Sequence, residues 1–328
     1  MVSIDGLRWQ EVFRGADDAY FKRNLKGVLE PAAKKYTAGS TYARRALLMP
    51  FLWNTIAKQG QVFGDPARRS RSHRTNGLWF SYPGYNEMLV GVADPRIDSN
   101  NKTPNPNVTV LEWLNTRRGF AGKVSAFGSW DVLPYIVNTE RSHLPVGTAF
   151  RPVPDPNTGR ENDINTLARD LPAYWDYGTF DAPLVYAAIE ALKSRKPRVL
   201  YLMLGEGDEW AHEGRYDLYL DATKRADRFV ERLWTTLQSL PEYRGRTTLL
   251  ITTDHGRGPT PKDWSNHGKD VPAAEDTWIA VLGPEVPALG VRANVTVTTS
   301  QFAATIAAVV GEDYRAAVPR AAPSLPLR

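Results

Sequence analysis

The segment Ile251-Thr252-Thr253-Asp254-His255-Gly256 ends a run of aliphatic and β-branched residues in an acid, a histidine and a glycine. β-Branched runs are typical of buried strands, and a carboxylate with an imidazole is a donor pair that zinc-type ions bind. Adjacent strand residues point to opposite faces, so both side chains reach one ion only if the backbone turns, which Gly256 permits. Taken alone, the pair fits an ordinary turn as well as a metal site.

More acids and histidines lie on both sides of this segment. Asp208 and His212 are four residues apart, so a helix over 206–213 would place both on one face. His267 follows within a glycine-containing loop, and three of the five histidines thus fall between residues 212 and 267. Each of these groups taken alone is compatible with a helix-end acid or a surface histidine. Together, the number of donors predicts more than one metal ion.

The surrounding pattern predicts an α/β fold. Near-continuous apolar runs at 2–5, 198–204 and 247–253 are typical of strands that are buried on both faces, as in a parallel sheet. The stretch 216–240 carries a helical stripe of apolar residues, and strand–helix–strand order implies a right-handed βαβ unit. We therefore expect a three-layer αβα sandwich around a mostly parallel central sheet.

Three acids stand at or just past the ends of these predicted strands, namely Asp5, Asp208 and Asp254. In open α/β sheets, ligands bind beyond the carboxyl ends of the strands. Three strands that each deliver a carboxylate to one edge are hard to explain by loop polarity alone. The sequence therefore places the functional site at this edge of the sheet.

Other elements follow from periodicity and from helix-breaking residues. Residues 92–107 and 144–160 read as loops, and the tail 321–328 reads as disordered. The chain 1–328 is expected to form one domain with an insertion at about 92–190 that forms the substrate pocket. Helices are predicted over 42–58, 108–116, 181–194 and 300–310, the last capped by Thr299 or Ser300 and stopped by Gly311, and a strand over 278–282.

Composition sets limits on the function. The chain has no cysteine, so disulfides and thiolate metal sites are excluded. The net charge is +5, and the densest basic run, Arg68, Arg69, Arg71 and Arg74, reads as a solvated loop or as a means of steering an anionic substrate. No nucleic-acid-binding motif accompanies this run.

The sequence leaves compartment and oligomeric state open. No apolar segment has the roughly 18 residues of a membrane span, and no signal peptide is recognised. Residues 1–6 read as the end of a buried strand without its beginning. We therefore expect that the chain has been shortened upstream, and the lack of a leader does not fix its destination.

A nucleophile is suggested by the segment Phe80-Ser81-Tyr82-Pro83-Gly84-Tyr85. It joins an aromatic strand-like run to an apolar helical stretch that ends at Gly91. Ser81 would stand at a helix N-terminus, where free N–H groups favour an alkoxide and an incoming phosphate. The alternative is a plain N-cap serine.

In combination, these segments resemble the alkaline phosphatase superfamily, especially its nucleotide pyrophosphatase/phosphodiesterase-like (type I phosphodiesterase) branch. The resemblance spans residues 5 to 268, most of the chain, and the stretch 297–311 is similar to the family's closing helix. Five pieces match in family order: Ile4 to Arg8, Ser81 to Gly91, Gly207-Asp208 with His212, Thr253 to Gly256, and His267-Gly268.

This resemblance implies a metal-dependent hydrolase that cleaves phosphate mono- or diesters through a phosphoserine intermediate. It implies two divalent ions, zinc first, with manganese or iron as alternatives. Asp5, Asp254 and His255 would hold one ion, with Ser81 bound to it as the nucleophile. The second ion would be held by Asp208, His212 and His267. A small anionic phosphate ester is the expected substrate, and a periplasmic or secreted origin is compatible with the family.

Departures from the family pattern leave alternatives open. The branch usually has threonine where Ser81 stands, and sulfatases carry arginine where this chain has Tyr85, which argues against a sulfatase. An asparagine about twenty residues after the nucleophile would correspond to Asn101, with Lys102 as the alternative; a neutral amide suits a diester and a cation suits a monoester. Hydrolysis of sulfate esters or phosphonates, or metal and anion binding without catalysis, are the remaining possibilities.

Overall fold

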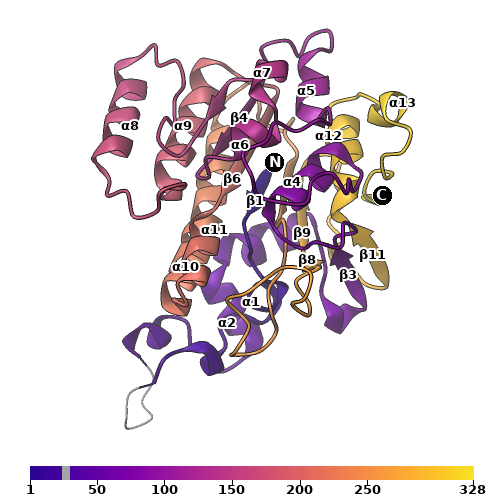
Figure 1. Cartoon of the computed structure of the whole chain (residues 1–328). Helices are drawn as coiled ribbons and strands as arrows, with labels where there is room; N and C mark the ends of the chain where they lie inside the picture. The colour runs from indigo at the N-terminus through magenta and orange to yellow at the C-terminus, as the bar shows by residue number, and fades with distance from the viewer. Residues whose placement is uncertain (24–29) are drawn as a thin grey trace.

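An eight-stranded, mostly parallel sheet forms the centre of the computed structural model, which describes residues 1–23 and 30–328 (Figure 1). Only β9 runs antiparallel to its neighbours, β7 and β2. The strand order is β10 (Gly290–Val291), β2 (Gln61–Phe63), β9 (Ile279–Leu282), β7 (Leu249–Thr252), β1 (Val2–Ile4), β6 (Val199–Leu204), β4 (Val124–Gly128) and β5 (Val146–Gly147). The predicted α/β class with a mostly parallel sheet is confirmed.

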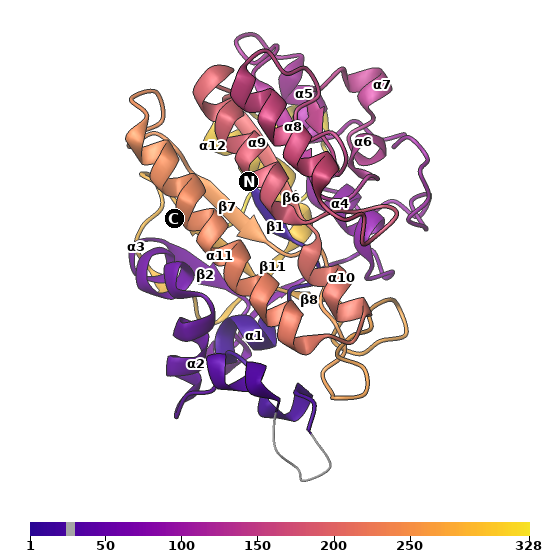
Figure 2. The same cartoon turned by 90° about the vertical axis from the view of Figure 1, so that its left-hand side faces the viewer.

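Side chains of the sheet alternate between two apolar cores, one on each face. On β6, Leu202 and Leu204 belong to the first core, whereas Tyr201 and Met203 belong to the second. Helices α9 (Asp181–Ser194) and α11 (Tyr216–Ser239) cover the first face, and α5 (Val110–Asn115) and α12 (Phe302–Val309) cover the second (Figures 1 and 2). The strands are thus buried on both sides, as their near-continuous apolar sequence predicts.

The remaining elements surround this frame. A three-stranded sheet in the order β11 (Val295–Thr298), β3 (Ser70–His73), β8 (Asp276–Thr277) lies beside the main sheet. The other helices are α1 (Trp9–Arg14), α2 (Thr41–Leu48), α3 (Ala57–Gln59), α4 (Ser81–Val90), α6 (Leu133–Ile136), α7 (Thr139–Ser142), α8 (Gly159–Asp170), α10 (Glu206–His212) and α13 (Tyr314–Ala317).

Strands β7, β1 and β6 are adjacent and parallel, and they fix the position of the acids predicted at their ends. Val2 is paired with Leu202 on one side and with Ile251 on the other. The strand–helix–strand unit β6–α11–β7 has the predicted order and length. The three strands therefore end at one edge of the sheet, and Asp5, Asp208 and Asp254 follow them there.

Several predicted element boundaries were wrong. The helix expected over 42–58 is divided into α2, a π-helical turn at Leu52–Ile56 and α3, because Met49 precedes Pro50 and leaves the helical region. The closing helix begins one residue earlier than expected, since Thr298 forms a reciprocal capping box with Gln301. The loop expected at 144–160 contains β5 and the first residues of α8.

Three further stretches are more ordered than their composition suggests. Residues 92–190 are not set apart from the central sheet, because they supply β4 and β5 to it. The basic run flanks and includes β3; Arg68, Arg69 and Arg71 are exposed, whereas Arg74 is buried rather than solvated. The tail 321–328 packs on the second core through buried Ala321 and Leu325.

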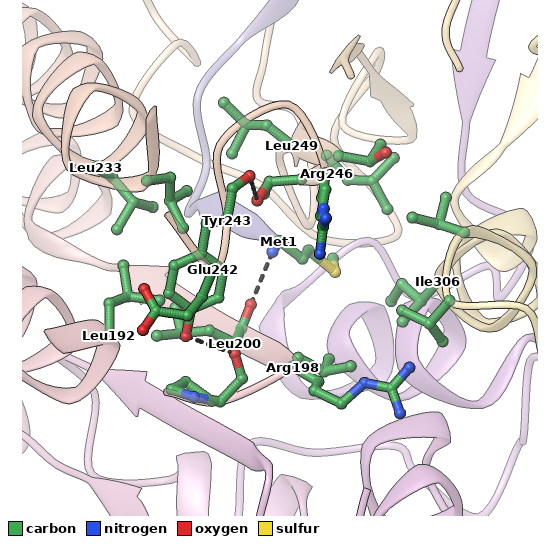
Figure 3. Close-up of a pocket in the computed structure, with 18 of the residues that line it drawn as sticks. Met1, Leu192, Arg198, Leu200, Leu233, Glu242, Tyr243, Arg246, Leu249 and Ile306 are labelled. Carbon is green, nitrogen blue, oxygen red and sulfur yellow. Dashed lines mark hydrogen bonds between the residues drawn. The ribbon is translucent and has the colours of Figure 1, made fainter. Parts of the chain in front are cut away.

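The opposite edge of the sheet has a cavity of about 520 Å³ lined by leucines of α9, α11 and β7 together with Arg198, Glu242 and Arg246 (Figure 3). The amino group of Met1 donates a hydrogen bond to Leu200 O at 2.8 Å within it. None of the three strand-end acids lines this cavity. Over the described residues, no helix has the length and apolar character needed to cross a bilayer.

Asp227 of α11 holds the chain where the predicted long helix is interrupted. Its carboxylate accepts hydrogen bonds from Phe51 N at 2.8 Å and from Leu52 N at 2.9 Å, and burial raises its pKa to about 7. Asp227→Ala would leave both N–H groups without an acceptor and should cost about 2–4 kcal/mol in urea unfolding. Glu231→Ala, an exposed position of the same helix, is the control and should cost less than about 0.5 kcal/mol. Equal losses would contradict this role for Asp227.

Candidate metal centre

Loops after the three central strands and one helix start bring the predicted residues together. Asp5 follows β1, Asp254 and His255 follow β7, and α10 carries Asp208 and His212 after β6. His267 comes from the loop beyond β7. Ser81 is the first residue of α4, and the preceding Phe80 has extended backbone angles, as at a helix N-terminus. All seven residues predicted as metal ligands thus lie at the carboxyl edge of the sheet.

The first donor set is Asp5, Asp254 and His255. One atom from each lies within 4.8 Å of the other two. His255 Nε2 is 3.3 Å from Asp5 Oδ1, 3.5 Å from Asp254 Oδ2 and 3.4 Å from Ser81 Oγ. The other ring nitrogen, Nδ1, lies 2.9 Å from Gly256 O. A hydrogen bond from Nδ1–H to this carbonyl leaves Nε2 free to act as a donor to a metal.

Two carboxylate oxygens of this set show that the residues fit a cation. Asp5 Oδ1 and Asp254 Oδ2 are buried and have no hydrogen-bond partner. Burial raises the pKa of Asp254 to about 7, and the neighbouring charge of Asp5 adds to this effect. Buried anionic oxygens are stable only when they are paired, protonated or bound to a metal. A divalent ion between them would supply the missing charge.

The second donor set is Asp208, His212 and His267. His212 Nε2 is 3.0 Å from Asp208 Oδ2 and 3.1 Å from His267 Nε2. Burial lowers the pKa of both histidines, which favours the neutral form that binds metals. The ring of His267 stacks on that of His255 with centroids 3.9 Å apart, and Asp208 Oδ1 is 3.8 Å from His255 Nε2. The two sets are therefore contiguous.

Arg257 joins the loops that carry these donors. It was not predicted as a site residue, and its place two residues after His255 is the one feature of the sequence that points to it. Its guanidinium is fully buried and forms an ion pair with Asp208 Oδ1. It also donates to Gly6 O at 3.2 Å and to Ser265 O. Burial lowers the pKa of Arg257 to about 9. Gly6 has a φ of +58°, and a Cβ there would meet Asp208 Oδ1 at 2.5 Å, so this corner requires glycine.

Tyr85 takes a specific role at the position where sulfatases carry arginine. Its hydroxyl donates to Asp5 Oδ2 at 2.7 Å. This bond occupies one oxygen of Asp5 and leaves the unpartnered Oδ1 on the side of His255. Tyr85 thus orients a predicted ligand, which is what residues behind metal ligands commonly do.

Arg74 supports the helix that carries the nucleophile. Its guanidinium is buried against Gly84 and donates to Phe80 O at 3.0 Å, next to Ser81. A Cβ at position 84 would lie 2.4 Å from Arg74 Nη2, so only glycine leaves room for this contact. Two other nitrogens of Arg74, Nε and Nη1, have no hydrogen-bond partner. This buried cation adds positive charge beneath the start of α4.

A cavity of about 310 Å³ opens above the two donor sets and reaches Ser81. Asn100 and Lys102 line it, whereas the exposed Asn101 does not. Of the two predicted residues, Lys102 therefore lies at the cavity and Asn101 beside it, and a role of either in substrate binding stays a prediction. A hydrogen bond of 2.9 Å from Tyr82 N to Asn100 Oδ1 fixes the Asn100 side chain at the helix start. Lys102 forms an ion pair of 2.6 Å with Asp131.

A buried network attaches α10 to the end of β4. Asp181 Oδ1 accepts hydrogen bonds from Ser129 Oγ at 2.7 Å and from Gly205 N at 2.9 Å. Burial raises the pKa of Asp181 to about 7, with repulsion from Glu206 as a further cause. Because Gly205 directly precedes α10, this network positions the helix that carries Asp208 and His212.

Comparisons with known proteins support the metal centre. Residues 176–311 match the model of the metalloenzyme superfamily, and this range includes five of the seven predicted ligands, Asp208, His212, Asp254, His255 and His267. No curated protein sequence matches the chain significantly.

Solved structures share the fold at low sequence identity. The wild-type alkaline phosphatase PafA is 10% identical with a TM-score of 0.58, and the match covers 94% of each chain. The phosphonate monoester hydrolase SpPMH from Silicibacter pomeroyi is 15% identical with a TM-score of 0.56, covering 99% of this chain and 74% of the other. Ps i-CgsB in complex with k-i-k-neocarrahexaose is 14% identical with a TM-score of 0.58, covering 98% and 73%. The predicted resemblance to the alkaline phosphatase superfamily is confirmed at the level of the fold, while no comparison singles out its nucleotide pyrophosphatase/phosphodiesterase branch.

Proposed function

We propose that the chain hydrolyses phosphate esters with two divalent metal ions and with Ser81 as the nucleophile. The observation that carries this proposal is the position of Ser81 Oγ, 3.4 Å from His255 Nε2 at the boundary of two contiguous donor sets. A serine placed only to cap a helix needs no such surroundings. The seven oxygen and nitrogen ligands suit zinc best, with manganese or iron as alternatives.

Ser81 needs activation, because a serine hydroxyl is a weak nucleophile at neutral pH. His255 Nε2 faces both the carboxylates of the first donor set and Ser81 Oγ. If this nitrogen binds a metal ion, its lone pair is not available for the Ser81 proton, so His255 is poorly placed to act as a general base. Bound divalent ions would lower the pKa of the hydroxyl and neutralise charge on the phosphoryl and leaving oxygens. The positive end of the α4 helix dipole, where Ser81 is the first residue, and the buried Arg74 favour the same negative charge.

The reaction then consists of two displacements at phosphorus. Ser81 Oγ forms a bond to phosphorus while the bond to the leaving alcohol breaks on the opposite side. The hydroxyl proton goes to solvent, and the leaving alkoxide takes up a proton. Water next attacks the phosphoserine, which releases the phosphate product and restores the Ser81 hydroxyl. Asn100, fixed through its Oδ1, can direct its Nδ2 amide towards a phosphoryl oxygen.

Sulfate esters and phosphonates distribute charge in a similar way, so the reaction test must include them. Two observations favour phosphate esters over sulfate esters. Tyr85, rather than the arginine typical of sulfatases, contacts Asp5. The second donor set also supports a two-metal site, because His212 contacts both Asp208 and His267, and one ligand atom each of Asp208, His267 and His255 lies within 4.8 Å of the other two.

Ser81→Ala should lower kcat/KM for the substrate that is turned over by at least about a thousandfold, because it removes the attacking oxygen. Initial rates on p-nitrophenyl phosphate, bis-p-nitrophenyl phosphate and p-nitrophenyl sulfate, with added Zn²⁺ or Mn²⁺, provide the measurement. Ser125→Ala, at a buried serine of β4, is the matched control and should keep nearly full activity.

Three outcomes would overturn the proposal. Full activity of Ser81→Ala would remove Ser81 from the nucleophile's role. Metal binding without turnover of any ester would indicate a protein that binds metal and anions without catalysis. A clear preference for the sulfate ester would show that the site hydrolyses sulfate esters rather than phosphate esters.

Metal binding should depend on pH through Asp254. Its raised pKa means that, without metal, the folded protein holds a proton that the unfolded chain loses from about pH 4 upwards. This contribution to stability is present at low pH and is lost as the pH rises to about 7. A metal ion replaces the proton, so stabilisation by Mn²⁺ in urea unfolding should be larger at about pH 8 than at about pH 5.5. Asp254→Asn should remove most of this difference, and equal stabilisation at both pH values in the unaltered protein would contradict the assignment.

A further inference from the structure

The pocket above the metal centre has an outer wall made of aromatic rings and charged side chains. Trp130, Asp131, Tyr177 and Glu209 line the cavity together with Lys102. Two segments pair to build this wall, since Asp131 N donates to Tyr177 O at 2.9 Å and Thr179 N donates to Ser129 O at 2.9 Å. The rings and carboxylates are therefore held by backbone hydrogen bonds.

Carboxyl groups outnumber cationic side chains in this wall. Lys102 Nζ is bound to Asp131 Oδ2 at 2.6 Å, and no other lysine or arginine is among the described residues that line the cavity. Asp131 Oδ1 has no hydrogen-bond partner. Glu209 Oε2 accepts one hydrogen bond, from the Tyr177 hydroxyl at 3.0 Å, and has no cationic partner. The wall thus presents two carboxyl groups to the cavity but only one cationic side chain, which is already bound to Asp131.

The wall lies next to the second donor set, on the side of the site where the leaving group would be. Glu209 directly follows Asp208 on α10, and His212 lies one turn further along the same helix. The first donor set lies against the attacking Ser81 Oγ, so in an in-line displacement the second donor set would face the leaving oxygen. A group attached to that oxygen would therefore lie between Glu209, Tyr177 and Trp130.

We propose that this wall selects phosphate esters of an ammonium-bearing alcohol, a proposal that rests on the hydrolase function above. Aromatic faces next to carboxylates attract alkylammonium groups by cation–π and charge interactions, and they repel a further anionic group. An ester with additional phosphate or carboxylate groups would meet Asp131 and Glu209 without a free cation to receive it. A neutral polyol would leave the Glu209 carboxyl without a cationic partner.

The test compares esters that differ only in this charge. The choline and the 3,3-dimethylbutyl group have the same shape, but carbon replaces nitrogen in the second. Both are offered as phosphate monoesters and as methyl diesters, with the matching glyceryl esters as the polyol comparison, and phosphorus NMR follows whichever ester bond breaks. The choline ester should show kcat/KM at least about tenfold above its carbon isostere, mainly through a lower KM.

Variants of the wall should move this ratio in opposite directions. Asp131→Asn, Glu209→Gln and Trp130→Leu should each lower the preference for the choline ester, whereas Lys102→Met should raise it by freeing Asp131 from its cation. Turnover of the carbon isostere reports whether each variant is folded. Tyr42→Leu, at an exposed tyrosine of α2, is the control and should leave the ratio unchanged.

The results separate failure of this inference from failure of the proposed function. Equal turnover of the choline ester and its isostere, preference for the glyceryl ester, or a ratio that no wall variant changes would overturn the selectivity while the hydrolase function stands. If no ester of any kind is hydrolysed, p-nitrophenyl esters included, the proposed function fails and the selectivity with it.

Discussion

Three carboxylates that are forced together at one sheet edge are the constraint on which this structure depends. Strands β1, β6 and β7 are adjacent and parallel, so the residues that follow them, Asp5, Asp208 and Asp254, must meet. Like charges a few ångströms apart in a protein interior repel by about 4 kcal/mol per pair at a moderate effective dielectric. The fold is stable only if positive charge or protons offset this repulsion.

The surroundings of the acids supply part of that charge and leave room for more. Arg257 pairs with Asp208, Tyr85 donates to Asp5, and His255 lies between Asp5 and Asp254. Even so, Asp5 Oδ1 and Asp254 Oδ2 keep no hydrogen-bond partner, and burial raises the pKa of Asp254 to about 7. The same repulsion that costs stability in the metal-free protein is what would bind divalent ions, so stability and function are coupled at this edge.

Much of this arrangement could be predicted from the sequence, because it depends on order along the chain. Strand-like runs followed by acids locate the edge of the sheet, and the helix on which Asp208 and His212 would share one face is present as α10. The supporting residues could not be predicted in this way. Arg74 and Arg257 reach the site through long side chains and tertiary contacts, and an arginine in a basic run looks solvated until β3 is known to turn it inward. Which residue of the loop 99–102 faces the cavity also depends on a tertiary hydrogen bond, here from Tyr82 N to Asn100 Oδ1, and spacing along the chain cannot supply it.

The central claim is that the two donor sets hold two metal ions, and an anomalous-scattering crystal structure of the protein grown with Zn²⁺ tests it most directly. We expect two anomalous peaks about 3.5–4 Å apart. One should lie among Asp5, Asp254, His255 and Ser81, and the other among Asp208, His212 and His267. A single peak, or peaks away from these residues with the carboxylates still unpartnered, would contradict the account.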